Sequence, residues 1–257
     1  MSDSPLVSVV LATRDRPRFL PLALEWYHRQ TYANRELIVV DDGEHHPIAA
    51  EAVERVGGRL LRLDAVTLLG AKLNLGCEAA RGTICVKMDD DDWYAPRYVE
   101  TMVAGLRGPL ASTCRPTMAF LTPFRFFDVS NWLIRRSDDG NVPGATLVFM
   151  RENWAEAPFR GLTSNEDMWF CHDQRTLGVL PRPVVAPDVY LAVRHTGASQ
   201  DRGHAWRRQW HGEELDSYLL RRPVEKTPES LLPRWALARY RSLRGELLAE
   251  RPQLAAV

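Results

Sequence analysis

The first hundred residues alternate between two patterns of hydrophobic and polar positions. Short apolar runs rich in valine and leucine, typical of strands covered on both faces, occupy residues 6–14, 36–40, 59–63 and 83–88. Between them, apolar side chains recur at helical spacing over residues 19–30, 48–56 and 69–82. A chain that alternates strand and helix in this way predicts a parallel, doubly wound α/β sheet.

The pattern changes beyond residue 100. A helix is predicted over residues 96–106, where Pro96 suits a first-turn position, and another over residues 165–178. Strand patterns separated by turn residues occupy residues 118–129, 131–136 and 145–150. This half is therefore predicted to be mixed α+β and to continue the same sheet.

The last segment, residues 231–250, places leucine, tryptophan, alanine and tyrosine at helical spacing among arginines. We expect a tail helix packed on the body of the protein, with a homodimer contact as the alternative. The chain then divides into two halves of one domain, residues 1–110 and 111–200, followed by a helical tail, residues 201–257.

Composition narrows the class of protein. The 33 basic and 33 acidic residues cancel, which argues against a nucleic-acid partner. The four cysteines are widely spaced, form no CxxC pair and follow no secretory leader pattern, so a reduced, cytoplasmic setting is expected. No apolar stretch approaches the roughly 20 residues that a transmembrane helix needs.

Acidic residues follow two of the predicted strands at the point where each strand ends. Asp41 and Asp42 close the second strand, and Asp90 and Asp91 belong to a run of four aspartates behind the fourth. Because ligands of an open parallel sheet bind at the carboxyl ends of its strands, we expect these carboxylates to face one crevice. Crowded carboxylates repel one another unless a cation is present, and Mg²⁺ or Mn²⁺ accepts such oxygen ligands. The alternative is a solvated acidic loop.

Four motifs follow one another along the chain: PLVSVVLATRDRP, QTYANRELIVVDDG, LGAKLNLGCEAARG and MDDDDWYAP. Together they resemble the inverting, nucleotide-sugar-dependent glycosyltransferases of the A-type fold, family 2. The resemblance implies an α/β fold with a mostly parallel central sheet flanked by helices, a mixed α+β acceptor half and a C-terminal helix. Residues 1–110 would then bind the nucleotide sugar, and residues 111–200 would bind the acceptor and carry the catalytic groups.

The resemblance also implies roles on the nucleotide side. Asp42 would hydrogen-bond the base, while Lys72 would lie near the nucleotide or would be an ordinary surface lysine. Asp89 and Asp90 would serve the ribose side, and Asp91 would hold the Mn²⁺ or Mg²⁺ ion that bridges the two phosphates. The residues that would line the base pocket follow the first strand: Thr13, Arg14 and Asp15.

Two further implied roles concern the chemistry. An inverting transfer needs a base that takes the proton of the acceptor hydroxyl, and the resemblance gives that role to Asp167, with Glu166 as its neighbour. Acids in the first turn of a helix also stabilise the helix, so both readings stay open. His195, after a late strand, would complete the metal site, or it is an ordinary polar residue.

The expected partner is a nucleoside-diphosphate sugar, with UDP preferred to GDP or dTDP as the nucleotide. A glycan end, a lipid-linked sugar, a peptide and a small molecule all stay open as acceptors.

Two other classes of protein are alternatives. A sugar-1-phosphate nucleotidyltransferase normally has a glycine-rich basic loop after its first strand, which the stretch ATRDRPRF lacks. The other alternative is a catalytically silent module that binds a nucleotide sugar.

Overall fold

The computed structural model describes residues 4–107, 118–137, 142–195 and 222–250. Its first part alternates strand and helix: β1 (Val7–Thr13), α1 (Leu20–His28), β2 (Arg35–Asp41), α2 (Ala50–Glu54), β3 (Gly58–Arg62), α3 (Leu69–Ala79) and β4 (Ile84–Lys87). Strand β1 pairs in parallel with β2 and β4, and β2 pairs in parallel with β3. The predicted doubly wound parallel arrangement of this half is confirmed.

Three strands of the second half extend this sheet: β6 (Met118–Leu121), β9 (Val148–Met150) and β10 (Arg182–Val184). The strand order is β10-β6-β9-β4-β1-β2-β3, and β9 runs antiparallel to both of its neighbours. The sheet is therefore mixed but mostly parallel, as predicted. The accompanying helices are α4 (Tyr98–Arg107), the 3₁₀ turn η1 (Gly144–Thr146), α5 (Arg151–Glu156) and α6 (Glu166–Thr176).

The remaining strands form a second sheet of order β12-β8-β7-β11-β5. Its members are β5 (Trp93–Tyr94), β7 (Arg125–Asp128), β8 (Leu133–Arg136), β11 (Tyr190–Arg194) and β12 (Val224–Lys226). The prediction that the whole second half continues the first sheet is wrong for these strands. The single strand predicted over residues 118–129 divides at the cis Thr122–Pro123 bond, since proline has no N–H for a sheet ladder.

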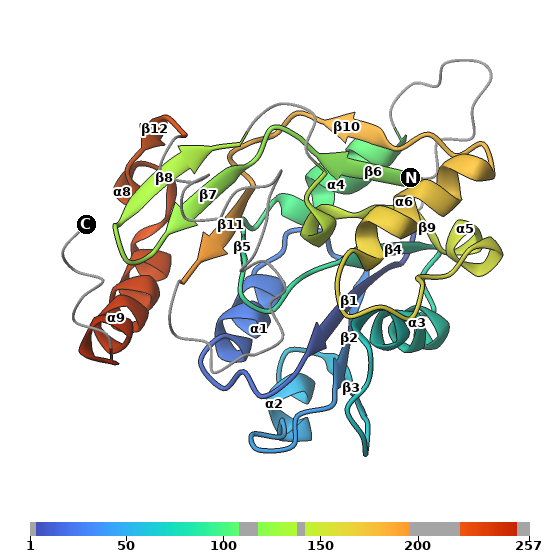
Figure 1. Cartoon of the computed structure of the whole chain (residues 1–257), viewed down its shortest axis with the longest axis horizontal. Helices are drawn as coiled ribbons and strands as arrows, with labels where there is room; N and C mark the ends of the chain where they lie inside the picture. Colours follow the sequence, from blue (N-terminus) through green and yellow to red (C-terminus); the bar gives the residue numbers. More distant parts are fainter. Residues whose placement is uncertain (1–3, 108–117, 138–141, 196–221, 251–257) are drawn as a thin grey trace.

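Both faces of the large sheet are buried. Val7, Val9 and Leu11 of β1 belong to the hydrophobic core that includes α1 and α4, whereas Val10 belongs to the core that includes α3 and α6. Successive side chains of a strand point to opposite faces, so a continuous apolar run is what two covered faces require. Figure 1 shows α1 and α3 on opposite sides of β1 and β2.

The tail contains α8 (Pro228–Leu231) and the long helix α9 (Arg234–Glu250). The ring centroid of Trp26, on α1, lies 4.9 Å from that of Trp235 and 5.9 Å from that of Tyr240. Tyr240 also meets Phe127 of β7, at 5.1 Å. These contacts confirm that α9 packs on the body of the protein (Figure 1).

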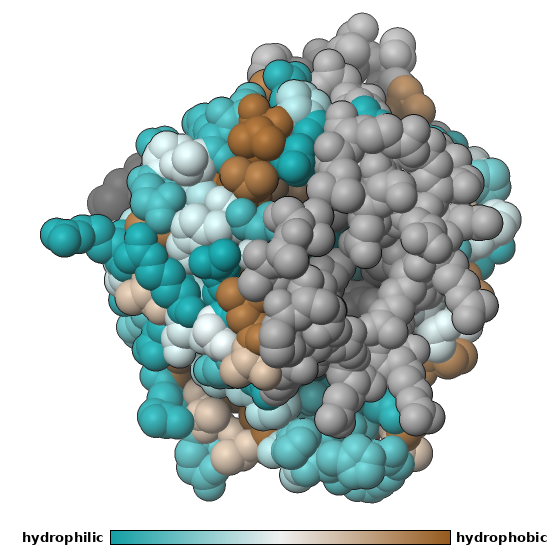
Figure 2. Space-filling view, turned by 60° about the vertical axis from the view of Figure 1, so that its left-hand side comes forward, coloured by the Kyte–Doolittle hydropathy of each residue, from teal (hydrophilic) through white to brown (hydrophobic). Residues whose placement is uncertain are grey.

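The side of the molecule that carries α9 is turned forward in Figure 2, where the described surface is mostly hydrophilic with small, separate hydrophobic areas. The outward side chains of α9 include Arg234, Arg239, Ser242 and Glu246. A homodimer contact through this helix stays a prediction. Within the described ranges, no helix combines the length and the apolar character that crossing a membrane requires.

Candidate functional site

The carboxyl ends of β1, β2 and β4 meet at one edge of the large sheet, because the three strands run in parallel. β2 lies on one side of β1 and β4 on the other, so the chain changes direction across the sheet between β1 and β4. Such a switch point is where open α/β sheets bind ligands. Here Oγ1 of Thr13, at the end of β1, donates a hydrogen bond of 2.5 Å to Oδ2 of Asp90, behind β4.

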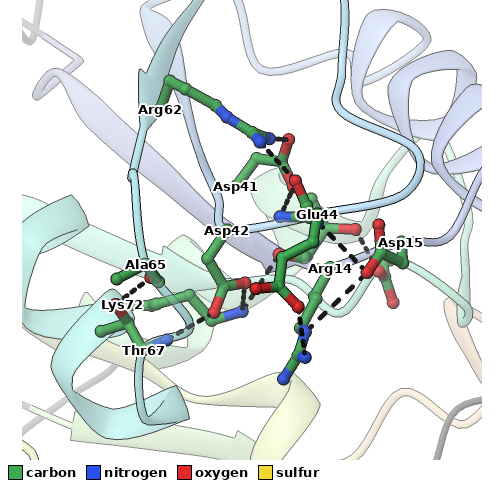
Figure 3. A network of polar contacts seen from close by, with 12 residues as sticks. Arg14, Asp15, Asp41, Asp42, Glu44, Arg62, Ala65, Thr67 and Lys72 are labelled. Atoms are coloured by element: carbon green, nitrogen blue, oxygen red, sulfur yellow. Dashed lines mark hydrogen bonds and ion pairs between the residues drawn. The ribbon is translucent and has the colours of Figure 1, made fainter.

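Asp42 and Lys72 form a buried ion pair beside this edge (Figure 3). Nζ of Lys72 donates to Oδ1 of Asp42 at 2.6 Å and to the carbonyl oxygen of Thr13 at 3.0 Å. The backbone N–H of Thr67 donates to the other Asp42 oxygen at 2.7 Å. Lys72 is only 5% exposed, so the alternative of a surface lysine is wrong. Each carboxylate oxygen of Asp42 keeps a second lone pair for a further donor.

Asp15 fixes the loop of residues 44–46 that follows β2. It has a left-handed backbone conformation, with φ of 50°, and its carboxylate accepts the backbone N–H groups of Glu44, His45 and His46 at 3.3, 2.8 and 2.8 Å. Burial raises the pKa of Asp15, but these hydrogen bonds outweigh it and the net pKa is lowered. Arg14, 44% exposed at its side chain, lies 3.6 Å from Glu44. Asp15 therefore holds the loop after β2, and Arg14 lies beside Glu44 and Asp15 with its side chain partly exposed (Figure 3).

Asp41 holds the same loop through hydrogen bonds and an ion pair. Its carboxylate accepts the N–H groups of Gly43 at 2.9 Å and Ile48 at 3.0 Å, and it pairs with Arg62. A Cβ atom on Gly43 would lie 2.9 Å from Asp15, so glycine is needed where the two acids approach the turn. Asp41 and Asp42 were expected to face a ligand crevice together. Both are buried: Asp41 is used to build the loop, and Asp42 pairs with Lys72.

The run of four aspartates separates into distinct environments. Nη1 of Arg16 lies 2.6 Å from Oδ1 of Asp90 and 2.8 Å from Oδ2 of Asp91. Nε2 of His195 lies 3.2 Å from the same Oδ2 of Asp91. Burial is the main cause that raises the pKa of Asp90, with the neighbouring Asp91 adding to it and Arg16 opposing it. Asp90 and Asp91 thus share one cationic partner, and His195, which follows β11, lies beside Asp91.

Asp92 instead connects the aspartate run to β11. It accepts the hydroxyl of Tyr190 at 2.5 Å and the N–H of Val193 at 2.8 Å, both on β11. Burial raises its pKa to about 7. Asp89, the most exposed of the four, pairs with Lys87 at 2.8 Å. The solvated acidic loop considered above is therefore wrong for Asp90, Asp91 and Asp92, which are buried.

Lys87 links the aspartates to the start of α6. Its Nζ lies 2.8 Å from Asp89 and 3.7 Å from Oε1 of Glu166. Burial lowers the pKa of Lys87, but the charges of Asp89, Glu166 and Asp167 together raise it above its ordinary value, so the ammonium stays charged. Burial likewise raises the pKa of Glu166 to about 7, against the opposing effect of Lys87. The two acids predicted for catalysis therefore lie in one electrostatic cluster with the aspartate run.

Asp167 packs against the 3₁₀ turn η1. A Cβ atom at Gly144 would lie only 1.9 Å from Oδ2 of Asp167, so the glycine leaves room for this carboxylate. The side chain is partly exposed, and Oδ1 accepts the N–H of Met168 at 2.8 Å. Asn165 precedes α6 with a left-handed φ of 60° and makes no side-chain cap. Stabilisation of the helix and a reactive role are compatible with this geometry.

The donor set near Asp91 suits a divalent ion such as Mn²⁺, although no group of three candidate ligands comes together among the described residues. Asp91 supplies a buried carboxylate and His195 a buried imidazole whose Nδ1 has no hydrogen-bond partner in the described part of the chain. Carboxylate and imidazole are both ligands that Mn²⁺ accepts. Two protein ligands are what a metal bound jointly with a phosphate group needs.

Residues 8–152 match the glycosyl transferase family 2 domain. The chain belongs to glycosyl transferase family 2. It is 35% identical over 104 residues to EpsH of Bacillus subtilis (strain 168), whose name describes a glycosyltransferase, and 28% identical over 110 residues to an uncharacterized glycosyltransferase of Haemophilus influenzae. These matches cover 39% and 41% of this chain but only 30% and 34% of the relatives. The chain thus spans about a third of the length of these curated family members.

Solved structures show the same fold for this family 2 chain. A mannosyltransferase from Pyrobaculum calidifontis, in complex with GDP-Man and Mn²⁺, aligns with a TM-score of 0.60 and 19% identity, covering 100% of this chain and 82% of its own. S. aureus TarS, residues 1–349 in complex with UDP, aligns with a TM-score of 0.58 and 15% identity, covering 73% and 60%. The predicted A-type glycosyltransferase fold is confirmed.

Two residues of the site are absent from the sequence-based predictions. Arg16 bridges Asp90 and Asp91, and Lys87 joins the aspartate run to Glu166. The only sequence signal for Lys87 is a charged residue inside an apolar strand run, and Arg16 differs from Arg14 only in its place after a turn. The predicted tail begins with residues 201–221, which lie outside the described residues.

Proposed function

We propose that this family 2 chain is a metal-dependent, inverting glycosyltransferase that moves a sugar from a nucleoside diphosphate to an acceptor hydroxyl. The observation that carries the proposal is a chain of contacts at the carboxyl edge of the large sheet. Lys72 links Asp42 to Thr13, Thr13 donates to Asp90, and Arg16 joins Asp90 to Asp91. Lys87 then connects Asp89 to Glu166, the residue before Asp167. A base-recognition carboxylate, a metal-ligating carboxylate and a candidate base are the three groups that a single displacement needs. The relatives and neighbours named above support the donor class.

The nucleotide would occupy the side of Asp42 and Arg14. Asp42 is held in place by Lys72 and by the N–H of Thr67, which orients its carboxylate. Its side chain is buried, so a base would have to displace the groups that cover it to reach the remaining lone pairs. Thr13 and Asp90, joined by a hydrogen bond, would lie between the base and the diphosphate. UDP is the first donor nucleotide to test. GDP comes second, because the mannosyltransferase neighbour carries GDP-Man.

Asp91 and His195 would hold the Mn²⁺ or Mg²⁺ ion, and Asp89 and Asp90 would serve the ribose side. When bound, the ion supplies positive charge that stabilises the diphosphate as it leaves. Lys87, charged and buried, holds Asp89 and Glu166 in place. These residues would orient the donor with its anomeric carbon toward the start of α6.

Asp167 would act as the base. Its carboxylate takes the proton of the acceptor hydroxyl, the acceptor oxygen forms a bond to the anomeric carbon, and the bond from that carbon to the diphosphate oxygen breaks. The electron pair leaves with the nucleoside diphosphate, and the configuration at the carbon inverts. Glu166 is the alternative base, since burial raises its pKa to about 7, a value that suits proton transfer near neutral pH.

The proposal is tested by incubating the full chain with UDP- and GDP-sugars, Mn²⁺ and a panel of acceptors, and by following release of the nucleoside diphosphate. Proton NMR of the product gives its anomeric configuration, which must be opposite to that of the donor. Tight binding of a nucleoside diphosphate without turnover on any acceptor would point to a silent binding module. Release of pyrophosphate from a nucleoside triphosphate would point to a nucleotidyltransferase.

A further inference from the structure

Arg16 stands between two of the site's aspartates. A single nitrogen, Nη1, lies 2.6 Å from Oδ1 of Asp90 and 2.8 Å from Oδ2 of Asp91. The arginine side chain is only 11% exposed, and both carboxylates are buried. The guanidinium therefore occupies the position of a cation shared by the two acids, and it offsets charges that would otherwise repel each other.

The backbone fixes Arg16 in this position. The left-handed conformation of Asp15 separates Arg14, which lies near Glu44, from Arg16, which turns inward. The carbonyl oxygen of Arg16 accepts the N–H groups of Phe19 and Leu20 at 3.2 and 3.1 Å, at the start of α1. The inward arginine is thus a built part of the site and not a chance surface contact.

The contact with Arg16 conflicts with a metal on Asp91. Oδ2 of Asp91 is the same oxygen that lies 3.2 Å from Nε2 of His195, the other proposed ligand. A divalent ion on that oxygen and a guanidinium 2.8 Å from it would repel each other in this buried setting. The metal can bind favourably there only if Arg16 moves to another anionic partner. The diphosphate of a donor is such a partner, since guanidinium groups bind phosphate oxygens through paired hydrogen bonds.

Building on the proposed function, we infer that Arg16 is a resident counter-cation that makes divalent-metal binding depend on the diphosphate of the donor. Without donor, Arg16 neutralises Asp90 and Asp91 and disfavours the metal. With donor, Arg16 contacts the diphosphate and releases Asp91, so the metal and the diphosphate bind as a coupled pair. The coupling is reciprocal, because each ligand must raise the affinity of the other by the same factor.

The test measures Mn²⁺ binding to the full chain by calorimetry and by the electron paramagnetic resonance signal of free Mn²⁺, with and without UDP or GDP. The wild type is expected to bind Mn²⁺ at least about tenfold more tightly when the diphosphate is present. Arg16→Gln is expected to bind Mn²⁺ alone at least about tenfold more tightly than the wild type, and to lose most of the coupling. Arg29→Gln removes the same charge at an exposed position after α1, where the arginine pairs with Glu25, and is expected to leave the affinity for Mn²⁺ alone unchanged.

The outcomes separate the two proposals. If the wild type binds Mn²⁺ with a diphosphate but Arg16→Gln binds Mn²⁺ alone no better than the wild type, the inference about Arg16 is wrong and the proposed function stands. If the wild type binds no diphosphate with Mn²⁺, the proposed function itself fails. Should Arg16→Gln not fold, Arg16→Met decides by the same comparison, because it also removes the positive charge and keeps a long, unbranched side chain.

Discussion

Nε2 of His195 lies 3.2 Å from Oδ2 of Asp91, although 104 residues separate them in the sequence. The neighbour of Asp91 explains how they meet. Asp92 accepts hydrogen bonds from the hydroxyl of Tyr190 and the N–H of Val193, and so ties β11 to the end of β4. One buried carboxylate thereby fixes the strand whose end carries the histidine.

Asp92→Ala is expected to weaken both stability and metal binding. Two buried donors lose their acceptor, which should cost about 2 kcal/mol or more in the free energy of unfolding, measured by urea denaturation. Because His195 is then less well held, the affinity for Mn²⁺ in the presence of UDP or GDP should fall about 10- to 100-fold. Asp64→Ala, at an exposed position, is the control. An unchanged Mn²⁺ affinity in Asp92→Ala would contradict the positioning role.

Lys72→Met is expected to be strongly destabilising. It leaves the buried charge of Asp42 without its partner, which typically costs about 3–5 kcal/mol. The double variant Lys72→Met/Asp42→Asn should recover much of that loss, since the remaining buried side chain is then neutral. Arg29→Met breaks an exposed pair with Glu25 and should cost less than about 1 kcal/mol. Chemical denaturation of the four proteins tests this, and equal losses in Lys72→Met and Arg29→Met would contradict it.

Glu166 should make stability depend on pH. Its pKa in the folded protein is raised from 4.5 to about 7, so the folded state holds this proton more tightly than the unfolded state does. Stability from this group is therefore present below about pH 4.5 and is lost as the pH rises to about 7. Between pH 5 and 8, the wild type should lose on the order of 2 kcal/mol of its free energy of unfolding through Glu166. Glu166→Gln should not show this loss.

The measurement for Glu166 is the free energy of unfolding at each pH for the wild type, Glu166→Gln and the exposed control Glu152→Gln. Other groups titrate in the same pH range. The contribution of Glu166 is therefore the difference between the wild-type and Glu166→Gln curves. The control should run parallel to the wild type. Parallel curves for Glu166→Gln and the wild type would show that the pKa of Glu166 is not raised in the folded protein.

Asp167→Asn tests the assignment of the base. The amide keeps the size of the side chain but cannot take the acceptor proton, so kcat is expected to fall about 10²- to 10⁴-fold while nucleoside-diphosphate affinity stays unchanged. Asp173→Asn, further along α6, serves as a control, since its carboxylate pairs with Arg160. Stopped assays under saturating donor and acceptor give kcat. A larger loss in Glu166→Gln than in Asp167→Asn would exchange the roles of the two acids.

Local patterns predicted the first half of the fold. β1, β2 and β4 are buried on both faces, so their sequences are continuous apolar runs that predict strands. The acidic residues after these strands indicated where a ligand site was expected. The second sheet was missed because its strands are short and pair over long distances, as β7 does with β11. Which sheet a short strand joins depends on tertiary packing, which a sequence pattern does not contain.

Local sequence patterns also fail to predict some residues of the candidate site. Asp42 and Asp91 could be proposed as site residues because they follow strands, whereas Arg16 and Lys87 contact acids far along the chain. Lys87 meets Glu166 after a separation that no periodicity describes. Arg16 and Arg14 differ through the left-handed turn at Asp15, a backbone feature that the residue type does not determine.

We expect Asp91 to be essential for metal-dependent sugar transfer, and the most direct test is nucleoside-diphosphate release from a UDP- or GDP-sugar with an acceptor and Mn²⁺. The wild type should turn over, lose turnover in EDTA and regain it when Mn²⁺ is added. Asp91→Ala should lose at least about 100-fold in turnover. Full turnover in EDTA, or in a folded Asp91→Ala protein, would contradict a role of Asp91 in metal-dependent transfer.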